Sequence, residues 1–316
     1  MTTIAKVAKR AGVSPTTVSH VLNHADRVSA DLRKRVHEAI AELGYVPNPL
    51  AQSLRTGRTN LVAMLIPDIR NPFYPEMVQA AQSDLEAIGV DLLVFNTDVP
   101  GGHSQEHGQH YLRQIRSRRI DGLIVGDFAL HGMHDTLLEI DLPTVFIGDL
   151  PNKAVDSVKI DDFGGGHQMG AYLAKKGHRR IAHLTGPSFF AEAMARAAGF
   201  EQGLRDNGVE PIDELRREGS YLGPSVIFFG NYLMAAGALA GFFDRGISVP
   251  KDIGIAVFGD QPQLEYVRPR ITRVGNTPSL LAHRATEMLL ERLSGAYTGP
   301  ARSEVIPCNL HAYDTA

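Results

Sequence analysis

The first 44 residues alternate apolar and polar positions with the period of short helices. Apolar residues three or four positions apart predict one helix that ends before Gly12 and contains Ile4, Val7, Ala8 and Ala11. Ser14 is suited to cap a second helix, and Pro15 fits its first position, where a missing N–H costs nothing. Two short helices joined by a tight turn form the helix-turn-helix pattern.

The second helix has two different faces. Val18, Val21 and Leu22 form an apolar stripe, and the other face carries short hydrogen-bonding side chains. These are Thr16, Thr17, Ser19, His20 and Asn23. The sequence therefore predicts a polar face that can read another molecule.

A third amphipathic segment covers residues 29–44. Ser29 is its expected N-cap and Gly44 its end, so three helices would share one small core. Asn48 and Pro49 predict a further helix that extends to Arg55. With about two turns it is too short to be stable alone, so we expect it to fold only with a partner.

From Leu61 onward, short apolar runs alternate with amphipathic segments. The runs are residues 61–67, 90–97, 120–126, 143–149, 157–161, 180–186, 225–230 and 254–259. The helical segments are residues 74–88, 104–117, 134–140, 165–176, 191–207 and 233–245. This alternation predicts parallel sheets covered on both faces and divided into two similar α/β halves. Ligands of such sheets bind beyond the carboxyl ends of the strands, so we expect a binding cleft between the halves.

Composition is typical of a globular protein with more than one domain. The chain has 316 residues, of which 43% are hydrophobic and 21% charged. Neither a membrane-spanning run nor the apolar core of a signal peptide is present, so we expect a cytoplasmic protein without membrane partners. Cys308 is the single cysteine, which excludes an internal disulfide and a multi-cysteine zinc site. We interpret it as a small apolar core residue.

Charge is distributed unevenly along the chain. Residues 1–60 contain nine Lys or Arg and four Asp or Glu, whereas the whole chain has a net charge of −3. The helix-turn-helix segment is thus basic and the remainder acidic. Positive charge on such a module favours binding to DNA phosphates, because released counterions supply much of the affinity.

Two other patterns suggest chemistry but carry little weight. His103, His107 and His110 could share a helix face and bind zinc or nickel, yet we expect them on an exposed surface helix. The glycine-rich residues 162–170 lack the third glycine of a dinucleotide loop, which would fall on Met169. We interpret that segment as a helix start that packs tightly on a strand. No catalytic constellation is evident, so we predict neither an enzyme nor a metal or cofactor site.

Several longer segments resemble a known family. TTIAKVAKRAGVSPTTVSHVLN, LGYVPNPLAQSLRTGRTN, IPDIRNPFYPEMVQA, KKGHRRIAHLTGP and ISVPKDIGIAVFGD are similar to the lactose-repressor and galactose-repressor (LacI/GalR) family of bacterial transcription regulators. The DNA-reading helix is similar to that of its purine-repressor members. The resemblance implies a helix-turn-helix DNA-binding domain at 1–47, a hinge helix and linker at 48–60, and an effector-binding and dimerisation domain at 61–316. That last domain would have the two-lobed fold of periplasmic binding proteins.

The resemblance also implies function and partners. A homodimer, or a dimer of dimers, would bind a near-palindromic double-stranded operator, and a small-molecule effector between the lobes would change the DNA affinity, most simply in a repressor. By position, DNA contacts fall on Thr3, Ser14, Pro15, Thr16, Thr17, Ser19, His20, Asn23, Ala51, Leu54 and Arg55. Leu54 matches the hinge leucine that wedges into the minor groove. Pro15 and Gln52 depart from commoner residues, so the operator sequence is not predicted.

Effector contacts are carried over in the same way. They fall on Phe73, Tyr74, Asp149, Phe190, Glu192, Arg196, Tyr221, Asn231 and Asp260. Phe73 and Tyr74 match an aromatic pair that stacks on the ligand, and the fork of Arg196 could hold a carboxylate or paired hydroxyls. The family usually has two adjacent acids where this chain has Gly259 and Asp260, and Glu192 is an acid where several relatives are neutral. The effector is therefore not identified.

The chain departs from the resemblance near residue 222. Only four residues separate Tyr221 from the run that begins at Val226, too few for the crossover helix that parallel strands need. We expect either that residues 218–222 do not join the sheet in the usual way or that a piece of chain is missing. The second half would then lose a covering helix and expose apolar sheet.

Two other classes of protein remain as alternatives. A solute-binding protein with an incidental basic N-terminus would explain the two lobes, and an α/β enzyme would explain the cleft. The missing export signal and the intact helix-turn-helix count against the first, and the missing catalytic cluster counts against the second.

Overall fold

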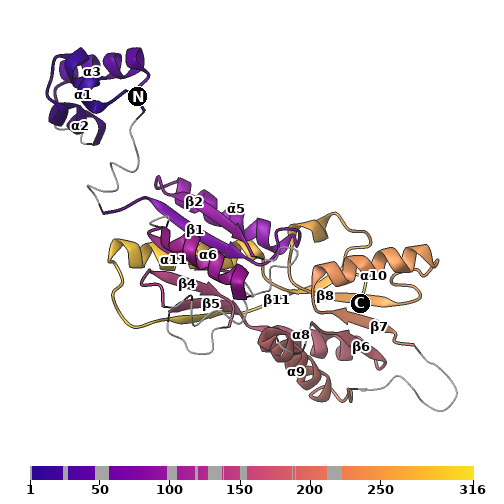
Figure 1. The fold of residues 1–316 in the computed structure, drawn as a ribbon. Helices are drawn as coiled ribbons and strands as arrows, with labels where there is room; N and C mark the ends of the chain where they lie inside the picture. Colours follow the sequence, from indigo (N-terminus) through magenta and orange to yellow (C-terminus); the bar gives the residue numbers. More distant parts are fainter. Residues whose placement is uncertain are drawn as a thin grey trace. The chain divides into compact units, whose positions relative to one another are not determined.

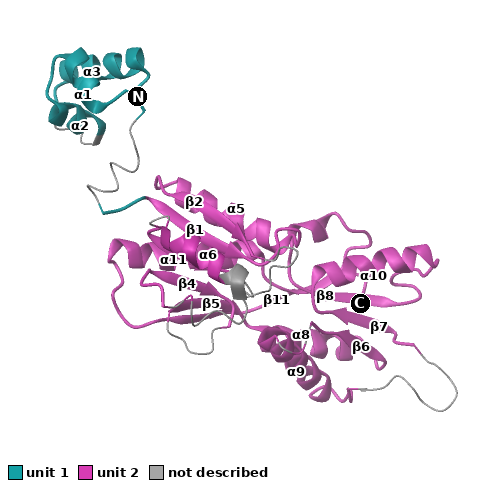
Figure 2. Ribbon diagram, in the orientation of Figure 1, with its two compact units in different colours: residues 1–59 teal, residues 60–316 magenta. Residues whose placement is uncertain are grey.

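The computed structural model describes residues 2–23, 28–46, 57–97, 105–117, 120–126, 137, 139–149, 155–186, 188, 190–211 and 223–316. The chain divides into two compact units, residues 1–59 and 60–316 (Figure 2). The predicted hinge helix at 49–55 and the predicted helix at 134–140 lie largely or wholly outside the described residues.

Unit 1 is a small three-helix domain, as the sequence predicts. Its helices are α1 (Ile4–Ala11), α2 (Pro15–Asn23) and α3 (Ala30–Leu43). Gly12 follows α1 with φ +64° and allows the tight turn into α2. The shared core consists of Val7, Ala8, Ala11, Val18, Val21, Val36 and Ala39. Ser29 stands at the N-cap of α3, but its side chain makes no capping hydrogen bond.

Unit 2 has two lobes, each built on one sheet (Figure 1). The strands of the first sheet, in the order β10-β5-β4-β3-β1-β2, are β10 (Ser303–Ile306), β5 (Asp156–Ile160), β4 (Thr144–Ile147), β3 (Gly122–Val125), β1 (Leu61–Ile66) and β2 (Asp91–Asn96). All neighbours pair in parallel. Helices α5 (Phe73–Glu86) and α11 (Pro278–Ser294) cover one face, and α6 (Gln105–Ser117) packs on the other.

The second lobe has a five-stranded sheet. In the order β11-β9-β8-β7-β6, its strands are β11 (Asn309–His311), β9 (Thr272–Gly275), β8 (Gly254–Phe258), β7 (Val226–Phe229) and β6 (Ile181–Leu184). Helices α8 (Asp162–Lys175) and α9 (Ala191–Arg205) cover one face. Helix α10 (Tyr232–Asp244) and the 3₁₀ turn η2 (Pro262–Glu265) cover the other. Only β11 runs antiparallel to its neighbour.

The eight predicted strands and five of the predicted helices of this region are confirmed within a few residues. The C-terminal elements β9, α11, β10 and β11 were not predicted. They return the chain from the second lobe to the first and back, so that a C-terminal strand completes the first sheet. Among the described residues, the chain therefore passes between the lobes from β5 to α8, from β9 to α11, and from β10 to β11.

The glycine-rich segment forms the start of α8, as predicted, and packs both on the sheet, where Gly165 lies against Phe258 of β8, and on helix α9. A Cβ at Gly166 or Gly170 would lie 2.2 Å or 2.3 Å from backbone oxygens of α9. A Cβ at Gly199 or Gly203 of α9 would lie 2.0 Å or 2.2 Å from backbone oxygens of α8. Glycine at these four positions lets the two helix backbones touch, which fixes the start of α8 against α9. Cys308 is buried in the same core, as predicted.

Apolar side chains are exposed on and beside α10. Leu233 and Phe243 of α10 are 47% and 85% exposed, and Leu184 of β6 is 42% exposed. Of these three residues, Leu184 belongs to the sheet, whose two faces carry helices. The expected exposure of apolar sheet stays a prediction, because residues 212–222 lie outside the described part of the chain. Another molecule could cover these exposed apolar side chains of α10.

Asp156 joins three elements of the first lobe. Its buried carboxylate accepts hydrogen bonds from Arg292 of α11, at 2.7 Å and 3.0 Å, and from the Nη2 atom of Arg302, at 2.8 Å. Burial alone would raise the pKa of Asp156, but these hydrogen bonds outweigh it and hold the pKa at about 2.

We therefore predict a pH-dependent effect of Asp156→Asn. A carboxylate whose pKa is lowered in the folded state stabilises the fold above its unfolded pKa, and the stabilisation is lost as the pH falls through the folded pKa. The free energy of unfolding, measured by urea denaturation, should fall by about 2 kcal/mol at pH 7. The difference from the parent protein should shrink to about half at pH 3. Glu201→Gln, which removes an exposed ion pair with Arg205, is the control. An Asp156→Asn effect that is the same at both pH values would contradict the assignment.

Candidate functional site

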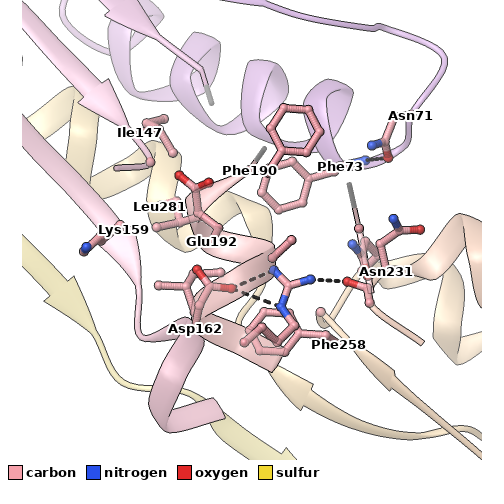
Figure 3. A pocket seen from close by; sticks show the side chains of 18 of the residues that line it. Asn71, Phe73, Ile147, Lys159, Asp162, Phe190, Glu192, Asn231, Phe258 and Leu281 are labelled. Atoms are coloured by element: carbon pink, nitrogen blue, oxygen red, sulfur yellow. Dashed lines mark hydrogen bonds and ion pairs between the residues drawn. The ribbon is translucent and has the colours of Figure 1, made fainter. Parts of the chain in front are cut away.

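A cavity of about 300 Å³ lies between the two lobes of unit 2 (Figure 3). It is lined from the first lobe by residues that follow β4 and β5 and by the start of α5, and from the second lobe by the starts of α8 and α9 and by residues that follow β6, β7 and β8. The cavity is therefore at the carboxyl ends of strands in both sheets, where the sequence predicts a ligand cleft.

Aromatic rings form much of the apolar wall. Phe73 and Tyr74, which the resemblance assigns to effector stacking, meet edge to face with their ring centroids 5.2 Å apart, and both line the cavity. Phe190 also lines it, and Figure 3 shows Phe73 and Phe190 on one side and Phe258 on the other. Flat apolar walls of this kind suit a ligand that contains a ring.

Arg196 lines the cavity from α9, and its fork is already occupied. Its Nε and Nη2 atoms donate to Oδ1 of Asp162 at 3.1 Å and 2.6 Å, and its Nη1 atom donates to the carbonyl of Gly230 (Figure 3). The guanidinium also lies 3.7 Å from the ring centroid of Phe258. Burial raises the pKa of Asp162, and the charge of Arg196 offsets part of that rise. An anionic ligand would have to compete with Asp162 for the arginine.

A second set of contacts joins the two lobes beside the cavity. The backbone N–H of Asp149, which follows β4, donates to Oε1 of Glu192 on α9 at 3.0 Å. The carboxylate of Asp149 pairs with Lys159 of β5 at 3.0 Å. Glu192 and Lys159 line the cavity. Asp149 is not among the lining residues, but it is bonded to both of them.

The other predicted effector residues have different positions. Asn231 lines the cavity, and its Oδ1 atom caps α10 by accepting from the N–H of Met234 at 3.0 Å. Asp260 does not line it, because its carboxylate is paired with Arg273 at 2.5 Å and with His311 at 3.5 Å. Tyr221 lies outside the described residues.

Sequence reasoning missed several residues that line the cavity. These include Asn71, Lys159, Asp162, Phe258 and Gln261. Most of them lie at the carboxyl ends of β5 and β8 or at the start of α5. The rule that ligands bind beyond strand ends could therefore have predicted the segments that contain them. Position along the chain does not reveal which side chains turn toward the cavity.

The predicted DNA-reading face lies on α2 of unit 1. Ser14, Pro15, Thr16 and His20 are exposed, and so is Thr3 before α1. Thr17 and Ser19 are half-buried. The hydroxyl of Ser14 accepts from the N–H of Thr17 at 3.1 Å, which confirms the predicted cap. The side chain of Asn23 is outside the described part of the chain, as are Ala51, Leu54 and Arg55.

The described part of the chain also bears on metal binding and on membrane insertion. No group of three or more His, Cys, Asp or Glu residues there could hold a metal ion. His110 is exposed on α6, while His103 and the side chain of His107 are not described. None of the described helices is both long enough and apolar enough to cross a membrane.

Comparison with known proteins gives matches over nearly the whole chain. Residues 3–48 match the model of bacterial regulatory proteins of the lacI family. Residues 59–220 match the periplasmic binding proteins and sugar-binding domain of the LacI family, and residues 171–315 match a periplasmic binding protein-like domain.

Individual relatives agree with these matches. The transcriptional repressor PurR of Erwinia tasmaniensis is 31% identical over 97% of this chain and 95% of its own. The transcriptional regulator DegA of Bacillus subtilis is 33% identical over 86% of each chain. Among solved structures, the lac repressor dimer bound to operator and the anti-inducer ONPF has a TM-score of 0.84 at 26% identity, covering 99% of this chain and 98% of its own. A complex of the transcriptional regulator CelR with cellobiose has a TM-score of 0.70 at 27% identity and covers both chains fully.

Proposed function

The chain belongs to the LacI family of bacterial regulatory proteins, and on that premise we propose how its two units divide the work of regulation. It is a ligand-responsive, DNA-binding transcription regulator and not an enzyme. Residues 1–47 read the operator, residues 48–60 form the hinge, and residues 61–316 bind the effector and dimerise. Because the operator is chromosomal DNA, the place of action is the cytoplasm.

Recognition of the operator is assigned to α2. The supporting observation is that α2 buries Val18 and Val21 in the core of unit 1 and carries exposed polar side chains on its other face. Packing of the buried face holds the exposed face in a fixed position for contact with DNA. Pro15, Thr16 and His20 face base edges in the major groove, because they are the most exposed along the helix. The remaining assigned contacts are made to phosphates, to neighbouring bases or in the minor groove, by Thr3, Ser14, Thr17, Ser19, Asn23, Ala51, Leu54 and Arg55. Operator palindromy then follows from a two-fold dimer.

The dimer interface is assigned to the exposed apolar side chains of α10. Leu233 and Phe243 are exposed apolar side chains near the two ends of that helix, where a two-fold related copy could cover them. The lac repressor, a structural neighbour, was solved as a dimer on its operator.

We expect the double variant Leu233→Glu with Phe243→Glu to convert the dimer to a monomer. Dimerisation would bury the new carboxylates of both copies in one interface, where like charges repel and lose their hydration. Analytical ultracentrifugation measures the mass directly. Tyr266→Glu is the matched control, since Tyr266 is also 85% exposed but does not lie on α10. Persistence of the dimer in the α10 variant would exclude this face.

The effector is assigned to the cavity between the lobes. One observation carries this assignment: a cavity with aromatic walls is lined jointly by both lobes, so a ligand there can stabilise one arrangement of the lobes over another. Phe73, Tyr74, Phe190, Glu192, Arg196 and Asn231 contact the ligand, and Asp149 acts through Glu192.

The chemistry of the cavity favours an uncharged effector with a polar ring. Among the described residues that line it, the cations Lys159 and Arg196 are already paired with carboxylates, and Glu192 adds a further negative charge. Sugars and purine bases have this chemistry. Thermal-shift measurements with cellobiose and hypoxanthine, compared with citrate, test the assignment. Stabilisation by an uncharged ring compound supports it, and stabilisation by citrate alone would contradict it.

A further inference from the structure

Gln261 lies at the carboxyl end of β8, between that strand and η2. The residue is one of those that line the cavity, and it is only 5% exposed. Its backbone carbonyl accepts from the N–H of Leu264 at 3.0 Å, which anchors the main chain in the first turn of η2. The carboxamide is thus held at the cavity by a fixed backbone.

Gly259 makes this position possible. Its φ of +105° lies in the region that favours glycine. A Cβ built on Gly259 would lie 2.8 Å from Oε1 and 2.9 Å from Nε2 of Gln261. The carboxamide of Gln261 therefore occupies the space in which a side chain at position 259 would begin.

The carboxamide differs from the other polar groups of the cavity. Arg196 is paired with Asp162, Glu192 accepts from Asp149, and the Oδ1 atom of Asn231 caps α10. In contrast, Oε1 of Gln261 is buried and has no hydrogen-bond partner in the part of the chain that the structure describes. Exchanging the amide oxygen and nitrogen would leave an N–H donor open instead, so one polar atom of the carboxamide lacks a partner among the described residues either way.

A buried acceptor without a partner is destabilising, and native proteins rarely keep one without a reason. We propose that Gln261 is a specificity-determining residue of the effector cavity, whose carboxamide hydrogen-bonds an uncharged hydroxyl or N–H group of the ligand. Gly259 is required because any side chain there would displace the carboxamide. This inference rests on the proposed function, since it assumes that the cavity binds the effector.

Gln261→Met in the full chain tests the inference, because methionine keeps the length of the side chain but removes both hydrogen-bonding atoms. Gln263→Met is the matched control: Oε1 of Gln263 is also buried without a partner among the described residues, but Gln263 does not line the cavity. Isothermal titration with cellobiose and with hypoxanthine measures the dissociation constant. For the probe that binds the parent protein, we expect Gln261→Met to raise the dissociation constant by about three- to tenfold and Gln263→Met to leave it unchanged.

The melting temperature of the ligand-free protein is a second measurement that needs no ligand. Gln261→Met should melt at the same temperature as the parent protein or higher, because it removes an unpaired acceptor. Unchanged probe affinity, or a melting temperature lower by about 4 °C or more, would overturn the inference. If Arg196→Ala abolishes probe binding while Gln261→Met leaves the affinity unchanged, the proposed role of Gln261 is wrong but the effector cavity is still supported. If neither variant changes the affinity, the effector does not bind in this cavity.

Discussion

Arg196→Ala should abolish effector binding and lower the free energy of unfolding by about 3 kcal/mol. The stability effect arises because Asp162, which is 8% exposed, would keep a buried carboxylate without its partner. The binding effect arises because the cavity would lose the guanidinium that packs on Phe258 and forms part of its wall. Urea denaturation measures the first effect, and titration with the uncharged probe that stabilises the parent protein measures the second.

Two further variants separate these effects. Arg205→Ala, on the same helix, removes an exposed ion pair with Glu201 and should change stability by less than about 1 kcal/mol. The double variant Asp162→Asn with Arg196→Ala should recover part of the stability, because no unpaired charge remains, but should still fail to bind the probe. Full probe affinity in that double variant would show that Arg196 does not serve the effector.

Removal of residues 1–59 should eliminate DNA binding and leave the effector cavity working. The basic residues of unit 1 and the exposed face of α2 are both lost, whereas unit 2 keeps its own cores in both lobes. Affinity for operator fragments selected from genomic DNA should fall by at least about 10³-fold, the usual margin between specific and non-specific binding. Electrophoretic mobility shift at several salt concentrations measures the affinity and its salt dependence.

The control for this deletion is probe binding by residues 60–316, which should equal that of the full chain. A truncated protein that binds the operator fragments as tightly as the full chain would show that unit 1 is not the DNA-binding unit.

Local patterns in the sequence were sufficient for most of the helices and strands, but not for the C-terminal ones. The period of apolar residues located α1, α2 and α3 in unit 1 and the strands β1 to β8 in unit 2, because each buries a face determined by neighbouring residues. The C-terminal strands could not be placed in this way. Pairing of β10 with β5 joins residues more than 140 positions apart, and no local period encodes such a partner.

The site was predictable in position but not in its pairings. The rule that ligands bind beyond strand ends located the cavity, and the family resemblance nominated Phe73, Phe190 and Arg196, which line it. They did not show that Asp162 already occupies the fork of Arg196, because that contact depends on the close packing of α8 on α9. Asp260 illustrates the same limit, since the buried Arg273 from β9 draws its carboxylate into an ion pair. Long-range charge pairs of this kind become visible only in three dimensions.

The most direct test of the account is the effect of the effector on DNA affinity. The operator dissociation constant of the full chain would be measured with and without a saturating amount of the uncharged probe that binds the cavity. We predict a change of about 5- to 150-fold, corresponding to a coupling free energy of about 1–3 kcal/mol, and no change in the double variant Asp162→Asn with Arg196→Ala. An operator affinity that stays the same while the probe saturates the cavity would contradict the claim that this cavity controls DNA binding.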